Sequence, residues 1–93
     1  MVKAELVAKV AQEHGLKVTI TQRAVDTMFT AMTRALVAGE GIEVRGFASF
    51  RVKRYEGYQG RNPRTGDLIK VSPKTGVIFK PGSELRQRVD GDA

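Results

Sequence analysis

The chain has 93 residues, enough for one small domain, and its 41% hydrophobic content is ordinary for a folded chain. It has no cysteine and a single histidine, His14, which excludes a disulfide framework, a zinc ribbon and a thiolate nucleophile. No apolar run reaches the ~18 residues of a membrane span, and Lys3 and Glu5 stand where a signal peptide needs apolar residues. We expect a soluble, intracellular protein with no cofactor, no metal, no membrane partner and no small-molecule substrate.

The net charge of +6 is unevenly distributed along the chain. Residues 1–44 carry five basic and five acidic side chains, whereas residues 45–88 carry eleven basic and three acidic ones. Generic surface charge would be spread evenly, so the second half is predicted to face a polyanion. Nucleic acid is favoured over a membrane surface or an acidic protein as that partner.

Two amphipathic helices are predicted at the start of the chain. Over residues 2–14 apolar side chains recur at helical spacing, and Gly15 supplies a left-handed stop. Thr19 and Gln22 match a capping box, which predicts a second helix over about residues 19–38. The two helices are expected to pack as an antiparallel pair.

The second helix carries an apolar arc that is too wide for one partner helix to cover. The arc comprises Val25, Met28, Phe29, Met32, Ala35, Leu36 and Val37. Packing against another subunit is the favoured use of the excess. A methionine-rich surface for varied partners is the alternative.

Residues 42–50 alternate between apolar and polar side chains, which predicts strands joined by a tight turn. Phe47 and Phe50 are predicted to be core residues. Glu43 and Arg45 are one pleat apart on the opposite face of the first strand, and they could form an exposed ion pair of little energetic weight.

Residues 53–73 are typical of a long β-ribbon with little core of its own. Each limb, out to Pro63 and back, has about ten residues and spans roughly 33 Å. A compact chain of this size has a radius of gyration near ~12 Å, so the ribbon must project from the body.

The chain then returns through a predicted buried strand at residues 76–79 and ends in a short helix over about residues 83–89. Leu85 and Val89 on this helix can cover the sheet. The start of the helix, which follows Lys80, is either a phosphate site or an ordinary cap.

The tip of the ribbon reads Gly-Arg-Asn-Pro-Arg-Thr-Gly over residues 60–66. Pro63 has a fixed φ and a stiff apolar face, while Arg61 and Arg64 offer forked donors suited to phosphate or groove edges. A rigid apolar wedge between basic groups can slip between base steps and kink a duplex from the minor groove. Taken alone, these residues are equally consistent with an ordinary turn.

The element order and two motifs together resemble the bacterial HU and integration host factor family over essentially the whole chain. The motifs are Gly46-Phe47-x-x-Phe50 and the tip sequence over residues 60–66. The resemblance implies an α+β fold in an intertwined dimer. Each chain would have two N-terminal helices, a three-stranded antiparallel sheet extended into a long β-ribbon DNA-binding arm, and a short C-terminal helix.

The resemblance also implies one domain over residues 1–93. Its expected parts are a helical dimerisation part at 1–40, a sheet at 41–80 with the arm at about 53–74, and a C-terminal helix and tail at 81–93.

The function implied by the resemblance is architectural and not enzymatic. A dimer in the cytoplasm, associated with the nucleoid, would bind double-stranded DNA through the minor groove and bend it, with Pro63 inserted between base pairs. Arg61, Asn62 and Arg64 would contact the DNA around that wedge. Candidate contacts on the body and the arm flanks are Lys3, Arg45, Lys53, Arg54, Lys70, Lys74, Lys80 and Arg86.

Within this family, residues 39–47 and 79–88 look more like integration host factor than like HU. There the residues matching Glu43 and Arg45 belong to a pair that helps to read a consensus site, which favours some sequence preference. Site-selective bending, general compaction, a homodimer and a heterodimer with a related chain all remain open. An RNA-binding module is a further alternative, because Arg-Asn-Pro beside tyrosines can stack on RNA bases.

The chain departs from the family pattern at the arm flank. Tyr55 and Tyr58 stand where the family usually carries arginines, and Glu56 lies between them. We therefore expect weaker or shifted electrostatics at this point. The tyrosines could pack across the ribbon and stiffen it.

Overall fold

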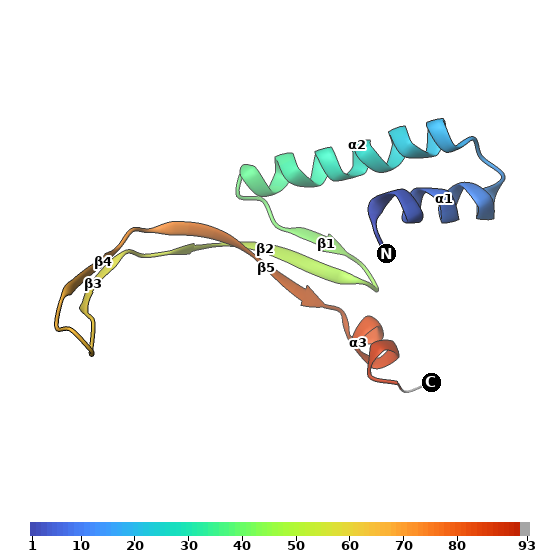
Figure 1. Cartoon of the computed structure of the whole chain (residues 1–93). Helices are drawn as coiled ribbons and strands as arrows, with labels where there is room; N and C mark the ends of the chain where they lie inside the picture. Colours follow the sequence, from blue (N-terminus) through green and yellow to red (C-terminus); the bar gives the residue numbers. More distant parts are fainter. Residues whose placement is uncertain (92–93) are drawn as a thin grey trace.

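The computed structural model describes residues 1–91 and has the α+β fold drawn in Figure 1. Two antiparallel helices lie beside a small sheet, a two-stranded ribbon projects from that body, and a short helix follows the last strand (Figure 1). The chain measures 62 × 34 × 24 Å, with a radius of gyration of 19.5 Å. That radius is well above the ~12 Å of a compact chain, which confirms the prediction of a projecting ribbon.

Helices α1 (Lys3–His14) and α2 (Val18–Val37) form the predicted antiparallel pair. Helix α1 ends as predicted at Gly15, whose φ of 62° lies in the left-handed region. The buried residues of the pair are few, and most are small. They are Val7, Ala11, Thr21 and Val25.

The start of α2 differs from the predicted capping box at Thr19 and Gln22. The helix begins at Val18, with Lys17 as N-cap and no side-chain hydrogen bond at the cap. The carbonyl of Lys17 accepts from the backbone N–H of Thr21 at 3.0 Å and from its hydroxyl at 2.9 Å. Thr19 therefore lies inside the first turn and cannot act as the N-cap.

Three antiparallel strands form the body sheet in the order β1–β2–β5. They are β1 (Ile42–Val44), β2 (Ala48–Tyr55) and β5 (Lys74–Pro81). Gly46, with a φ of 81°, makes the turn between β1 and β2. The predicted hairpin is thus confirmed.

The outer part of the ribbon is a separate two-stranded ladder. Beyond the paired strands β2 and β5, β3 (Tyr58–Arg61) pairs with β4 (Leu68–Val71). Between the two ladders, a Cβ atom at Gly57 would lie 2.8 Å from Cδ of Pro73. Only glycine fits at this joint, which we call the ribbon joint.

The strand register gives the body sheet two distinct faces. Residues directly opposite each other in an antiparallel pair point to the same side, and neighbours along a strand alternate. One side, the apolar face, carries Ile42, Val44, Ala48, Phe50, Val52, Val77, Phe79 and Pro81. The other side, the basic face, carries Glu43, Ser49, Arg51, Lys53, Tyr55, Lys74, Gly76, Ile78 and Lys80.

Several residues predicted to be buried are open to solvent in the single chain. Phe47 and Phe79, in the predicted core and return strand, are 48% and 51% exposed. Phe50 is half-buried and meets Phe79 edge to face, with ring centroids 5.4 Å apart. Helix α3 (Ser83–Val89) lies beyond the end of β5 and leaves Val89 78% exposed. These burial predictions are wrong for one chain, because its own elements cover the apolar face only in part: Ala48 is buried there, whereas Phe79 is not.

Candidate nucleic-acid interface

The tip of the ribbon is a turn closed by hydrogen bonds. The N–H of Asn62 donates to the carbonyl of Asp67 at 2.8 Å, and the N–H of Gly66 donates to the carbonyl of Asn62 at 2.7 Å. The side-chain oxygen of Asn62 accepts from the N–H of Arg64 at 2.9 Å, which forms an Asx turn around Pro63. Pro63 is therefore exposed at the apex of a well-defined loop.

The two arginines beside the apex have different roles in the free protein. The guanidinium of Arg61, at the end of β3, donates to the carbonyl of Gly66 at 3.2 Å and so supports the turn. The guanidinium of Arg64 makes no hydrogen bond to residues 1–91 and is free to meet a phosphate. The structure thus brings the predicted tip residues together around Pro63.

A second group of predicted residues meets on the body. Arg45, Lys80 and Arg86 line one cleft between the β1–β2 turn, the end of β5 and the start of α3. The N–H of Gly82 donates to the carbonyl of Phe47 at 2.7 Å, and a Cβ atom at residue 82 would lie 3.0 Å from that oxygen. Glycine therefore allows α3 to start against the turn. Three cations from separate segments share this concave surface with one carboxylate, that of Glu43, so its formal net charge is positive and suits an anionic backbone.

From this cleft toward the arm, the basic face carries a row of cations that starts at Lys80 in the cleft itself. The row comprises Lys80, Arg51, Lys53 and Lys74. Arg51 was not among the predicted contacts. Its spacing of two residues from Lys53 is the sequence signal that places it on the same side of the strand.

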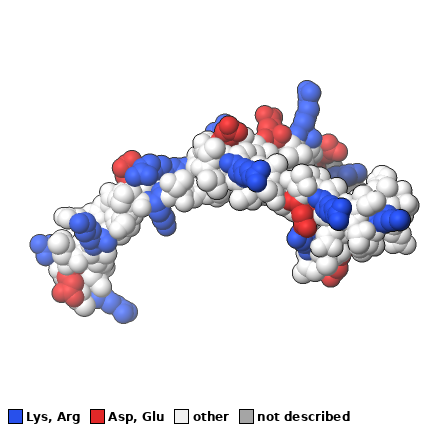
Figure 2. All heavy atoms as spheres, turned by 90° about the horizontal axis from the view of Figure 1, so that it is seen from above, with Lys and Arg blue, Asp and Glu red and all other residues white. Residues whose placement is uncertain are grey.

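The remaining ribbon cations lie elsewhere. Arg54 lies opposite Thr75 on the other side of the ribbon from Lys53, so the structure separates it from the row. Lys70 lies opposite Gln59 in the outer ladder, on the same side as Arg61. Figure 2 shows Lys and Arg side chains from the body along the ribbon to its tip.

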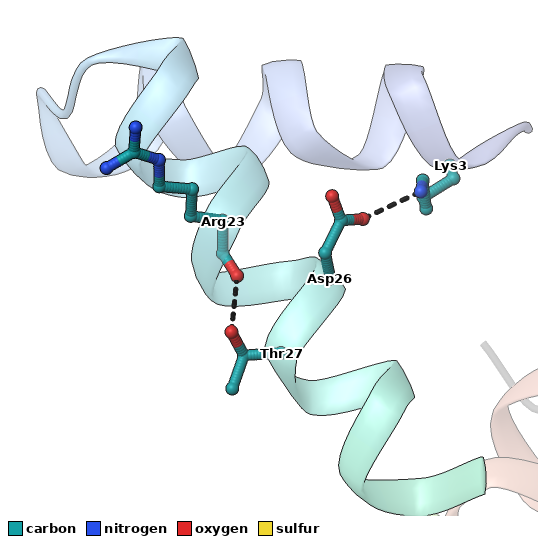
Figure 3. A network of polar contacts seen from close by, with 4 residues as sticks. All are labelled: Lys3, Arg23, Asp26 and Thr27. Carbon is teal, nitrogen blue, oxygen red and sulfur yellow. Dashed lines mark hydrogen bonds and ion pairs between the residues drawn. The ribbon is translucent and has the colours of Figure 1, made fainter.

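Lys3 is engaged with another residue of the protein. Its ammonium group donates to Oδ1 of Asp26 at 2.7 Å and links α1 to α2 (Figure 3). On the neighbouring turn, the hydroxyl of Thr27 donates to the carbonyl of Arg23 at 2.8 Å (Figure 3). An exposed ion pair contributes only about 0–1 kcal/mol, so Lys3 can exchange this carboxylate for a phosphate at small cost.

The predicted ion pair between Glu43 and Arg45 does not form. Arg45 lies beyond the end of β1, in the turn, and does not continue the pleat. Within residues 1–91 the only ion pair within 4 Å is that of Lys3 with Asp26. In this same part of the chain no three His, Cys, Asp or Glu side chains are grouped to hold a metal ion, and no helix is long and apolar enough to cross a membrane.

A helical pair, a small antiparallel sheet and a projecting basic ribbon with a proline tip define a class of bacterial proteins. Residues 1–90 match the profile of the family described as bacterial DNA-binding protein. The chain belongs to this family, which contains HU and integration host factor.

Individual relatives agree over the whole chain. Integration host factor subunit beta from Burkholderia cenocepacia and that from Burkholderia mallei are each 47% identical over 94 residues, which cover 100% of this chain and 88% of the relative. HU from Thermotoga maritima is 31% identical, with a TM-score of 0.64 over 96% of this chain and 98% of that one. An Anabaena HU in a cocrystal with DNA is 24% identical, with a TM-score of 0.84 over 98% of this chain and 99% of that one. The Anabaena likeness supports the fold assignment.

Proposed function

We propose that this chain, paired with a second copy or with a related chain, holds double-stranded DNA in the minor groove and bends it with Pro63 as a wedge. The observation that carries the proposal is the tip, where an exposed proline at the apex of a hydrogen-bonded turn stands between two arginines. A stiff apolar group there can unstack a base step while the cations hold the phosphates. The protein would organise DNA in the nucleoid, a role that needs no catalytic group.

The uncovered apolar surface supports a two-chain assembly. Met28 and Phe29 on α2 are 60% and 43% exposed, and Phe79 on the apolar face is 51% exposed. A chain of this size that buries so few residues has little stability alone. A second chain would cover these side chains and add a second arm.

The separation of the basic sites supports bending over simple binding. The cleft with Arg45 lies on the body, whereas Pro63 lies at the far end of a molecule 62 Å long. Smooth bending of a site of 20–30 base pairs costs about 1–6 kcal/mol, and unstacking a step costs a few more. Phosphate contacts at both places offset this cost, and a bent duplex can meet both at once.

The test is fluorescence transfer between the ends of a duplex of a few helical turns, titrated with the protein. A random sequence and a site of the integration host factor type are measured in parallel. We expect the ends to approach each other strongly on binding. Binding without approach would overturn the bending proposal, and tighter binding to RNA of equal length would favour the RNA-binding alternative.

Site-selective bending is the second candidate function. It is favoured by the 47% identity to integration host factor subunit beta and by the place of Arg45 in the lining of the body cleft. A minor-groove reader sees a degenerate base code, so one such contact would act together with DNA deformability. On this reading Arg45→Ala reduces the preference for one duplex over the other. The matched change Lys80→Ala, in the same cleft, weakens binding to both equally.

A further inference from the structure

We propose that Tyr55 is a positioning residue that holds Lys53 and Lys74 as a paired phosphate-binding site at the root of the arm. The proposal rests on the function proposed above, because the phosphate belongs to the bound DNA. Tyr55 and Lys74 form the last pair of the β2–β5 ladder, directly before the ribbon joint, and Lys53 lies two residues before Tyr55 on the same basic face.

The ring of Tyr55 is in contact with two ammonium groups. Nζ of Lys53 lies 5.2 Å from the ring centroid, and Nζ of Lys74 lies 5.8 Å from it. Both distances are within the ~6 Å over which cation–π attraction operates. Lys53 is two residues away on the same strand, and Lys74 is directly opposite on β5, so the strand geometry itself places both lysines beside the ring.

The ring is held by the neighbouring strand and not by the lysines alone. Gly76 lies diagonally across from Tyr55, and a Cβ atom at residue 76 would be 3.4 Å from Cε2 of the ring. The ring therefore leans over the bare backbone of the glycine, as aromatic side chains do when they cover strand glycines.

The paired site has an unmatched charge of two. Within the described residues the only ion pair is that of Lys3 with Asp26, so no carboxylate within 4 Å neutralises Lys53 or Lys74. Two unmatched positive charges around one ring attract anions to this part of the basic face. A phosphodiester is the anion that DNA supplies, and a lysine ammonium binds it as a point charge.

The ring contributes by ordering the two lysine side chains before DNA binds. A free lysine side chain loses much rotamer freedom when it is fixed on a phosphate. Tyr55 restricts that freedom before binding, so less is lost on the DNA. A neutral residue thus strengthens an electrostatic contact at a position where the sequence alone predicts weaker electrostatics.

The test compares three variants by fluorescence anisotropy with a labelled duplex. Tyr55→Leu keeps apolar cover on Gly76 but removes the ring, and we expect it to weaken binding about three- to tenfold. Tyr55→Phe keeps the ring and is expected to bind within twofold of the native protein. Tyr58→Leu, the matched control in the outer ladder, makes no cation–π contact in the described structure and is expected to change affinity less than twofold.

A double-mutant cycle separates positioning from a purely structural role. When Lys53 and Lys74 are both changed to Gln, Tyr55→Leu is expected to have less than a twofold effect, because the groups that it positions are gone. An equal loss in both backgrounds, or no loss in the native background, would overturn the proposal.

A measurement without DNA checks the geometry itself. The side-chain protons of Lys53 and Lys74 should show ring-current shifts in the native protein and in Tyr55→Phe, and lose them in Tyr55→Leu. Native-like shifts in Tyr55→Leu would contradict the proposal. Bending of the duplex by the native protein is assayed in parallel. If the native protein does not bend the duplex, the proposed function is wrong. If it bends the duplex but Tyr55→Leu binds as tightly as the native protein, only this inference is wrong.

Discussion

Replacement of Phe79 by alanine tests whether a second chain covers the apolar face. In the single chain Phe79 is 51% exposed and touches Phe50 edge to face, with centroids 5.4 Å apart. Removal of a fully buried phenylalanine costs about 3–5 kcal/mol, and a half-exposed one costs about half as much. If a second chain covers the apolar face, each of the two Phe79 side chains is fully buried, and the dimer loses the full contribution twice. We therefore expect Phe79→Ala to lower the free energy of unfolding by about 6–10 kcal/mol per dimer, against about 2 kcal/mol for a monomer.

The dependence of the Tm on protein concentration is a second, independent test of the dimer. When a dimer unfolds to two chains, each tenfold dilution lowers its apparent stability by about 1.4 kcal/mol. Two chains of 93 residues have an unfolding entropy of about 0.4 kcal/mol per kelvin. The Tm of the native protein should therefore fall by about 3–4 °C for each tenfold dilution.

The assay is circular dichroism during thermal and urea unfolding, at protein concentrations a hundredfold apart. Leu68→Ala is the control, because Leu68 is 63% exposed on the outer ladder and its truncation should change stability by no more than about 0.5 kcal/mol. A Tm independent of concentration, together with a loss near 2 kcal/mol for Phe79→Ala, would refute the inference that a second chain covers this face.

Three further predictions concern DNA. Pro63→Ala should reduce the end-to-end approach of the duplex more than it reduces affinity, because alanine lacks the stiff apolar face. Arg61→Ala should reduce both the approach and the affinity. Unchanged bending by the Pro63 variant would refute the role of Pro63 as a wedge. Asp26→Asn releases Lys3 and should raise affinity about two- to fivefold in anisotropy titrations at low salt, and unchanged affinity would place Lys3 outside the interface. Lys70→Gln should make the slope of log K against log salt shallower by about 1.8 per dimer, and an unaltered slope would exclude a phosphate contact there.

The sequence was sufficient for the elements that depend on local signals. Gly15 ends α1 and Gly46 makes the first hairpin turn, since both positions need a left-handed backbone that glycine supplies. The capping box at Thr19 failed because matching residue types do not determine which carbonyl closes the first turn. In the structure that carbonyl belongs to Lys17.

Burial and pairing could not be predicted in the same way. Phe47 is apolar and lies in an alternating pattern, which predicts burial, yet the described residues of one chain leave it half exposed. The contact of Lys3 with Asp26 joins residues 23 positions apart and depends on how the helices pack. Strand alternation predicts that Arg51 and Arg54 lie on opposite sides of the ribbon. The strand register is needed to tell which of these sides carries the row of cations.

The ribbon joint gives the arm a mechanical property that neither ladder has alone. The β2–β5 ladder ends at the pair Tyr55–Lys74 and the outer ladder begins at the pair Tyr58–Val71, so a rotation of the outer ladder at the joint breaks no pairing of β2 with β5. The close packing of Gly57 on Pro73 limits the directions in which this rotation can occur. On the function proposed above, such a rotation would let the tip follow a groove whose width varies with base sequence, while the cations of the body cleft keep their positions.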